Sequence, residues 1–206
     1  MKSKFIVIEG LDGSGKSTQI RKLAENLKAE GIPCLATRQP SDGKVGEMAR
    51  AATKSGFPLE NETIALLFAA DRYQHYHDEI SPALKAGKYV ICDRYYYSNL
   101  AYQGQGPDSF NRILSYNQQI MRTGKPDITI FLDVAPEECI RRIKHSRQEI
   151  SIYETQAKLE QMRERYLTAF YHLRATDNII IMDTNNVSPQ TVTEKIWLVL
   201  KGDDCK

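Results

Sequence analysis

The sequence has few cysteines, and their spacing argues against two common kinds of site. It holds four, Cys34, Cys92, Cys139 and Cys205, and no two of them have the C-x-x-C spacing. A disulfide framework and a zinc site built on paired cysteines are therefore both disfavoured. We expect buried or idle thiols at these positions.

Long apolar runs are also missing from the sequence. The longest are only as long as a strand, and residues 1–8 hold no stretch that fits a signal peptide or a membrane span. We therefore expect a cytoplasmic protein without a membrane partner. Internal repeats, low-complexity tracts and linkers are missing too, so residues 1–206 are predicted to form a single domain.

The sequence carries no large excess of charge of one sign. Lys and Arg number 28 and Asp and Glu number 26, which gives a net charge of +2. Proteins that bind polyanions usually carry a marked basic excess, so this balance gives no support for a nucleic acid partner.

What the sequence does contain is a glycine-rich stretch over residues 10–18. It reads Gly-Leu-Asp-Gly-Ser-Gly-Lys-Ser-Thr and fits the pattern G-x-x-x-x-G-K-[ST] at every fixed position. A short apolar run at 5–8 precedes it, and residues 17–30 have helical spacing. The order strand, glycine loop, helix predicts a phosphate-binding loop.

The residue types in this loop suit a nucleoside triphosphate such as ATP. The glycines let the backbone turn tightly and aim N–H groups at phosphate oxygens, next to the positive end of a helix. Lys16 adds a mobile charge, and the Ser17 hydroxyl can ligate a Mg²⁺ ion that bridges two phosphates. The residues that we assign to the nucleotide are Gly10, Asp12, Gly13, Ser14, Gly15, Lys16, Ser17 and Thr18.

Strand-like segments alternate with helical patterns along the whole chain. The strand-like segments cover residues 5–8, 34–37, 88–92, 128–132 and 179–182. This alternation predicts an α/β fold of the P-loop class, with a doubly wound, five-stranded parallel sheet flanked by helices.

Two segments between the strands have less regular patterns. Residues 60–85 predict either one long helix or two helices joined near residues 75–77. Residues 144–153 are polar and basic without clear periodicity, and we predict a short mobile lid there. A long helix over 154–175 is expected to follow the lid.

Residues near the ends of strands indicate how the triphosphate is used. Asp93 and Arg94 directly follow the third strand, at the sheet edge where α/β proteins bind ligands. The Asn-Lys-x-Asp stretch of a guanine-specific switch is missing, and so is the Glu that motor ATPases usually place after this Asp. We therefore predict phosphoryl transfer to an acceptor, and Arg38, Arg72 and Arg94 favour an anionic one.

Five stretches together resemble the thymidylate kinases, a family of P-loop nucleoside monophosphate kinases, and the resemblance covers nearly the entire chain. They are the loop with the preceding Ile8-Glu9, then Thr37-Arg38-Gln39-Pro40, Leu67-Phe68-Ala69-Ala70-Asp71-Arg72, Asp93-Arg94-Tyr95 with Ser98 and Ala101-Tyr102-Gln103-Gly104, and the basic lid.

The resemblance implies an ATP-dependent dTMP kinase. Such an enzyme transfers the γ-phosphoryl group of Mg-ATP to dTMP and gives dTDP and ADP for dTTP synthesis. It implies catalytic roles for Lys16, Asp93 and Arg94, metal binding by Ser17 and Asp93, and adenine binding by Arg142. The acceptor site that it implies comprises Asp12, Arg38, Phe68, Arg72, Arg94, Ser98, Asn99, Tyr102 and Gln103.

Within that acceptor site the resemblance implies distinct tasks. Phe68 would stack on the thymine ring, and Arg72 would donate to its exocyclic oxygen. Arg38 and Arg94 would clamp the acceptor phosphate. Tyr102 would lie against C2' of the sugar and disfavour a ribonucleotide by its bulk.

Two positions depart from the pattern of the family. Gln39 stands where Glu is common, and the lid lacks a frequent Asp-Arg pair. Because Gly13 occupies a loop position at which some members carry arginine, we expect Arg147 of the lid to supply the charge on the transferring group.

Two alternative functions stay open. They are another pyrimidine nucleoside monophosphate kinase and a catalytically weak P-loop binding protein. The resemblance also suggests a homodimer.

Overall fold

A central parallel sheet organises the structure, a computed structural model that describes residues 3–53, 59–146 and 155–202. Its five strands lie in the order β2-β3-β1-β4-β5, and all neighbouring pairs are parallel. The strands are β1 (Phe5–Gly10), β2 (Cys34–Arg38), β3 (Tyr89–Asp93), β4 (Ile128–Asp133) and β5 (Ile179–Asp183). The predicted five-stranded parallel sheet is therefore confirmed.

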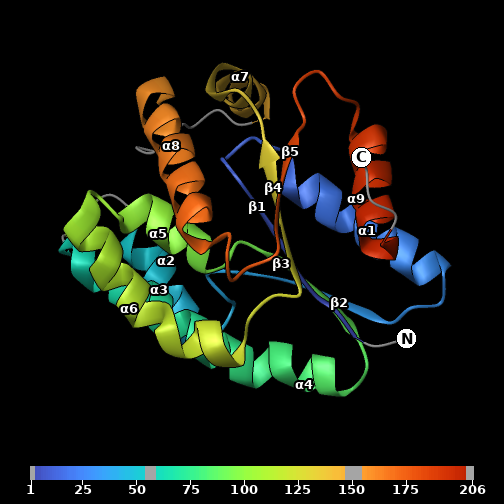
Figure 1. Ribbon diagram of the computed structural model, residues 1–206, viewed down its shortest axis with the longest axis horizontal. Coiled ribbons are helices and arrows are strands. Elements are labelled where there is room, and N and C mark those ends of the chain that lie inside the picture. The colour runs from blue at the N-terminus through green and yellow to red at the C-terminus, as the bar shows by residue number, and fades with distance from the viewer. Residues whose placement is uncertain (1–2, 54–58, 147–154, 203–206) are drawn as a thin grey trace.

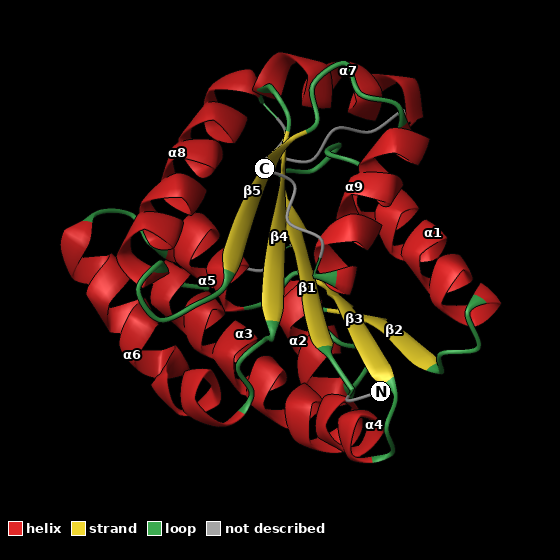
Figure 2. Ribbon diagram, turned by 45° about the vertical axis from the view of Figure 1, so that its right-hand side comes forward, coloured by secondary structure: helices red, strands yellow, loops and turns green. Residues whose placement is uncertain are grey.

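Helices cover both faces of this sheet (Figure 1). They are α1 (Lys16–Ala29), α2 (Lys44–Ala52), α3 (Asn61–His75), η1 (Tyr76–Ile80), α4 (Ser81–Lys85), α5 (Tyr96–Gln103), α6 (Pro107–Thr123), α7 (Pro136–Ser146), α8 (Gln156–Leu173) and α9 (Pro189–Lys201). Figure 2 shows α1 and α9 together on one face, with α3, α5, α6 and α8 on the other. None of the helices in these described ranges is long and apolar enough to cross a membrane.

Successive residues of β1 point to opposite faces of the sheet and enter two separate cores. Ile6 and Ile8 pack into the core under α1 and α9, whereas Phe5 and Val7 belong to the core on the other face. All four side chains are buried. A central strand covered on both faces requires this unbroken apolar run, because the side chains of a strand alternate in direction.

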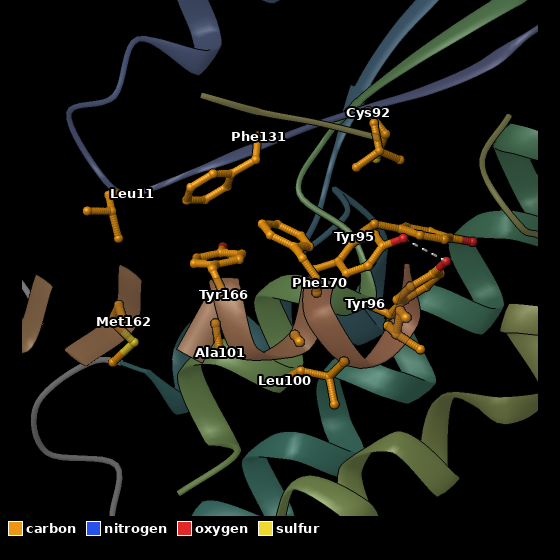
Figure 3. Packing of buried hydrophobic residues seen from close by; sticks show 14 of the residues in the cluster. Leu11, Cys92, Tyr95, Tyr96, Leu100, Ala101, Phe131, Met162, Tyr166 and Phe170 are labelled. Carbon is orange, nitrogen blue, oxygen red and sulfur yellow. Dashed lines mark hydrogen bonds between the residues drawn. The ribbon is translucent and has the colours of Figure 1, made fainter. Parts of the chain in front are cut away.

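The larger core is rich in aromatic rings (Figure 3). Phe131 of β4 contacts Tyr166 and Phe170 of α8, with ring centroids 5.1 and 5.0 Å away. Aromatic pairs at this separation each contribute about 0.5–1.5 kcal/mol beyond the burial of their area. The contact holds α8 against the sheet and brings Tyr166 within reach of the end of β1.

The stretch expected to form one long helix or two is one helical run with a π-helical segment inside it. Helix α3 ends at His75, η1 covers Tyr76–Ile80, and α4 follows without a break. In this segment the Ser81 N–H donates to the Tyr76 carbonyl, five residues earlier, and the next residue, Pro82, has no N–H to donate. The junction therefore begins close to the predicted residues 75–77.

Most of the predicted lid lies outside the described residues. Residues 144–146 form the end of α7, and residues 147–153, with Arg147 among them, are not described. The predicted long helix after the lid is present as α8, which begins at Gln156.

A buried carboxylate anchors the connection between α8 and β5. Asp177 accepts hydrogen bonds of 2.6 Å from the hydroxyls of Tyr96 and Tyr97, and Lys125 Nζ lies 2.9 Å from its other oxygen. Burial alone would raise the pKa of Asp177, but these donors outweigh burial, and the pKa lies below its ordinary value. The contacts tie the start of α5 to the amino end of β5.

We expect Asp177→Asn to lower the free energy of unfolding by about 2 kcal/mol at neutral pH, because hydrogen bonds to a charged acceptor are lost. Since the folded-state pKa is depressed, Asp177 stabilises the fold above its unfolded pKa of about 4 and loses this effect as the pH falls further. Urea denaturation across this range should show the gap to wild type closing in acid. The exposed Asp108→Asn on α6 is the control. A gap that does not change with pH would contradict the prediction.

Candidate active site

The glycine-rich loop joins β1 to α1 and contains a buried lysine. Lys16 Nζ donates to the carbonyl oxygens of Gly10, at 3.0 Å, and Leu11, at 2.9 Å. Burial lowers the pKa of Lys16, and the nearby charge of Arg94 lowers it further. The amine lies against the loop backbone, at the point where a bound phosphate would need a cation.

Gly13 occupies a position in the loop that has no room for a side chain. Its φ of 82° lies in the left-handed region, and a Cβ there would lie 2.6 Å from the carbonyl oxygen of Cys139 in α7. A larger residue would have to displace the backbone of α7 as well as adopt a strained conformation. The structure is thus consistent with glycine and unfavourable to arginine at this position.

The two predicted metal ligands, Ser17 and Asp93, both line a wide groove beside the loop. Asp93 ends β3 and lies in register with Ile8 of β1. Its Oδ1 atom is buried and has no hydrogen-bond partner within the described parts of the chain. Because buried polar atoms are nearly always paired, this oxygen has capacity for a ligand, and carboxylate oxygen suits Mg²⁺.

A cavity of about 210 Å³ next to the loop gathers most of the predicted acceptor residues. Its lining comes from the loop, from the segments that follow β2 and β3, and from α2, α3 and α5. The predicted residues that line it are Asp12, Phe68, Arg72, Arg94, Ser98, Asn99, Tyr102 and Gln103. The fold therefore brings into one place residues that lie far apart in the sequence.

Arg38 is the predicted acceptor residue that does not reach this cavity. Its side chain is exposed, pairs with Asp42 at 2.7 Å and lines the neighbouring groove, so the predicted clamp of Arg38 and Arg94 is not formed here. Neighbouring side chains of an extended segment point in opposite directions, and it is the buried Gln39 that lines the cavity. Among the described residues, the cavity is also lined by a cation that was not predicted, Arg50 of α2.

Arg94 lies at the centre of the site. Its guanidinium donates to Asp12 Oδ1 at 2.7 Å and to the hydroxyls of Tyr166, at 2.9 Å, and Tyr102, at 3.1 Å. Burial alone would raise the pKa of Asp12, but the charges of Arg94 and Lys16 outweigh burial and hold that pKa below its ordinary value. The pair is thus a fixed, charged unit that links the glycine loop to α5 and α8.

Glu9 is a second residue that sequence analysis did not assign. Its carboxylate accepts hydrogen bonds from the Tyr95 N–H at 2.7 Å, the Ser98 hydroxyl at 2.8 Å and the Tyr166 hydroxyl at 3.0 Å. Burial raises the pKa of Glu9, and the charge of Arg94 opposes this effect. The available signal was a carboxylate inside an otherwise apolar strand, since buried Glu is rare without partners.

Arg72 lines the cavity, and its hydrogen bonds to the residues that the structure describes all run to neutral oxygens. Its Nη atoms donate to Asn117 Oδ1 at 2.6 Å, to Asn99 Oδ1 at 3.3 Å and to the Tyr95 carbonyl at 3.2 Å. Its Nε atom is buried and has no partner among the residues that the structure describes. The guanidinium therefore keeps capacity to donate to a ligand.

A third hollow, of about 340 Å³, lies on the other side of the loop and contains Arg142. Thr18 of α1 contributes to its lining, together with Thr184 and Val187. Arg142, to which the resemblance assigns adenine binding, is therefore close to Thr184 and Val187.

Each of the three hollows is lined by a residue of the phosphate-binding motif: Ser17 in the groove, Asp12 in the acceptor cavity and Thr18 in the third hollow. Lys16 is buried within the same loop, and the largely buried Arg94 lines the acceptor cavity beside it. This arrangement can hold two anionic molecules on different sides of one loop and neutralise the charge where they meet.

Comparison with known proteins connects this site to one family. Residues 8–196 match the family described as thymidylate kinase. A probable thymidylate kinase of Pyrococcus horikoshii is 44% identical over 149 residues, 70% of this chain and 71% of that protein. A thymidylate kinase of a Synechococcus species is 38% identical over 200 residues, 96% of this chain and 95% of that protein. The match to the Synechococcus protein extends over nearly the whole length of both chains. The protein belongs to the thymidylate kinase family.

Proposed function

We propose that this protein is an ATP-dependent thymidylate kinase, which transfers the γ-phosphoryl group of ATP to dTMP and releases dTDP and ADP in dTTP synthesis. The position of Arg94 carries the proposal. This residue contacts Asp12 of the glycine loop and also lines the cavity that contains Phe68 and Arg72. A fixed guanidinium at the boundary of two anion sites suits the meeting point of a donor and an acceptor phosphate.

The far end of the cavity supports a pyrimidine acceptor. Phe68 would stack on the face of the base, and Arg72 would donate to an exocyclic oxygen at its edge. Asn99 and Gln103 would line the remaining edge, and Asp12 would contact the 3'-hydroxyl of the sugar.

The acceptor phosphate would be held between guanidinium groups. Arg94 and Arg50 line the same cavity, whereas Arg38 would have to leave Asp42 to reach the phosphate. Arginine suits this task because its planar fork matches two phosphate oxygens. Ser98, which receives a hydrogen bond from Arg94 at 3.2 Å, would help to orient it.

Ser17 and Asp93 would hold a Mg²⁺ ion beside the loop. The buried and unpaired Oδ1 of Asp93, judged within the described residues, supports this assignment. When bound, the ion would neutralise charge on the bridging phosphate oxygens. Lys16 would contribute the protein's own positive charge on the same phosphates, and Gly10, Gly13, Ser14 and Gly15 would leave room for their approach.

The proposal is tested by a steady-state assay of ADP release with a panel of nucleoside monophosphates. We expect kcat/KM to be highest with dTMP. A higher value with a different pyrimidine monophosphate would favour the alternative kinase, and ADP release without any monophosphate would indicate an ATPase. A protein that binds ATP but never turns over would be a binding protein. The cytoplasmic location stays a prediction of the sequence.

Tyr102→Ala is expected to relax discrimination against a 2'-hydroxyl group, because it removes a ring from the sugar side of the cavity. The Tyr102 hydroxyl also donates to Asp12 Oδ2 at 3.1 Å, so Tyr102→Phe separates the loss of this bond from the loss of bulk. The measurement is the ratio of kcat/KM for the deoxyribonucleotide and ribonucleotide forms of the acceptor. Equal losses for both forms in the alanine variant would assign Tyr102 to packing alone.

Arg147 of the lid lies outside the described residues, and we propose it as the cation that reaches the transferring phosphoryl group. The crowding at Gly13 supports a source of charge other than the loop. Arg147→Ala should lower kcat with little change in the KM for dTMP, the pattern of a contact made mainly in the transition state. A normal kcat together with a defective Lys144→Ala variant would transfer the role to Lys144.

We further propose that the protein forms a homodimer through the outer surface of α2 and α3. Leu66 and Tyr73, seven residues apart on α3, are 47% and 44% exposed, and Met48 of the adjacent α2 is 55% exposed. Residues at this spacing share one face of a helix, so Leu66 and Tyr73 form an apolar strip on α3 that a second copy could cover. Light scattering should give the mass of a dimer for wild type and of a monomer for Leu66→Glu.

A further inference from the structure

Asn117 of α6 is buried behind the acceptor cavity and is not one of its lining residues. Its side-chain amide makes three hydrogen bonds. Nδ2 donates to the Ile113 carbonyl at 2.8 Å and to Asn99 Oδ1 at 3.1 Å, while Oδ1 accepts from Arg72 at 2.6 Å. Both hydrogens of the NH₂ group and the oxygen are therefore in use.

The carbonyl of Ile113 fixes the orientation of this amide. A carbonyl oxygen only accepts, so the NH₂ group of Asn117 must face it, and Oδ1 must face Arg72. The bond from Arg72 to Asn117 is also the shortest that Arg72 makes, at 2.6 Å against 3.2 and 3.3 Å for the others. Asn117 is thus the main fixed acceptor for the guanidinium.

The same orientation continues through two further amides into the cavity. Because Asn99 Oδ1 receives hydrogen bonds from Asn117 and Arg72, its NH₂ group must point the other way, and it donates to Gln103 Oε1 at 3.1 Å. Gln103 lines the cavity, and its own NH₂ group is turned away from Asn99. The direction of hydrogen bonding therefore runs from Asn117 through Asn99 to Gln103.

We propose that Asn117 is a positioning residue that sets which hydrogen-bonding groups the cavity offers to the base. Asn117 holds the guanidinium of Arg72 and sets the orientation of the side-chain amides of Asn99 and Gln103. The cavity therefore offers hydrogen-bond donors, which suit a base with a carbonyl oxygen at its edge. The inference rests on the proposed function for the identity of that base. Thymine has a carbonyl oxygen at C4 where cytosine has an amino group, so Asn117 favours dTMP over dCMP without touching either.

Two measurements on Asn117→Leu test the proposal. In ¹⁵N spectra, separate Arg72 Nη signals should be resolved in wild type, since fixed hydrogen bonds slow rotation of the guanidinium, and they should merge in the variant. The Kd for dTMP should rise about tenfold, the loss expected for one hydrogen bond to a charged group, and the preference for dTMP over dCMP should fall by a similar factor. The kcat with saturating dTMP should change much less.

Asn117→Asp provides a second variant that keeps an acceptor for Arg72 and removes both donors. It should retain the separate Arg72 signals while losing part of the preference for dTMP, and it also serves if the leucine variant does not fold. The control is Ile120→Ala, which creates a cavity at a buried residue of the same helix. The Ile120 side chain makes no hydrogen bond to the amides of Asn117, Asn99 and Gln103. It should lower the melting temperature and leave the Arg72 signals and the preference unchanged.

Separate Arg72 signals in Asn117→Leu would overturn the proposal. If wild type binds dTMP, the same preference for dTMP over dCMP in Asn117→Leu as in wild type would also overturn it. If wild type binds no dTMP but the Arg72 signals still merge in Asn117→Leu, the positioning role stands and the proposed acceptor is wrong. Merged Arg72 signals in Asn117→Asp, or in Ile120→Ala, would also overturn it, because the acceptor oxygen is retained in both.

Discussion

Lys16→Ala is expected to lower kcat at least a hundredfold, because one preorganised group that stabilises developing charge is worth about this much. Lys16 Nζ is the buried cation of the glycine loop, within hydrogen-bond distance of the Gly10 and Leu11 carbonyl oxygens. The phosphates of a bound triphosphate would replace these neutral carbonyl oxygens as the partners of the amine. Rapid-quench measurement of the transfer step would separate this loss from weaker nucleotide binding.

The fold should survive this change. The hydrogen bonds of Lys16 run to backbone carbonyls of its own loop, and burial disfavours its charged form, as its lowered pKa reflects. The Lys16 charge also helps to hold the pKa of Asp12 low, so its removal should cost some stability, but less than the loss of the ion-paired Arg94. Lys22→Ala on the same helix, where Lys22 contacts Gln190 of α9, is the matched control. A Lys16→Ala enzyme as fast as this control would remove Lys16 from the mechanism.

The loop was predictable because its geometry depends on residues adjacent in sequence. The glycines, the lysine and the strand and helix on either side lie within one short segment, and periodicity is informative over such a range. The sheet was predictable for a related reason. The central strands β1 and β4 are buried on both faces, and they therefore had to be runs of mostly apolar, often β-branched residues.

The composition of the acceptor cavity was less predictable because it depends on side-chain direction. Arg38 ends β2 and Arg50 lies in α2, but only Arg50 lines the cavity, since Arg38 turns outward to Asp42. Periodicity does not reveal this choice, because it depends on the path of the chain between β2 and α2. Glu9 was overlooked for a similar reason, since the donors that satisfy it come from distant elements: Tyr95 and Tyr166.

Replacing Arg94 by alanine or by glycine is expected to lower kcat/KM for dTMP about a thousandfold in both cases, the range found for arginines that stabilise phosphoryl transfer. The two variants should nevertheless differ in stability. Arg94 has a φ of 68°, in the left-handed region, which costs a residue with a Cβ about 1–2 kcal/mol and costs glycine little. Arg94→Gly should therefore unfold at a higher urea concentration than Arg94→Ala.

Loss of the Arg94 charge should also make the stability difference between each variant and wild type depend on pH. In wild type that charge, with Lys16, holds the pKa of Asp12 below its ordinary value, and it limits the rise that burial causes in the pKa of Glu9. A depressed carboxyl pKa stabilises the fold above the unfolded value of about 4, and a raised one destabilises it there. In the variants the pKa values of Asp12 and Glu9 should both rise, which costs stability at neutral pH and little in acid. The difference in the free energy of unfolding between wild type and variant should therefore narrow as the pH falls through this range. A gap that widens in acid would contradict the assignment of Arg94 as the charge that compensates Asp12 and Glu9, whatever happens to turnover.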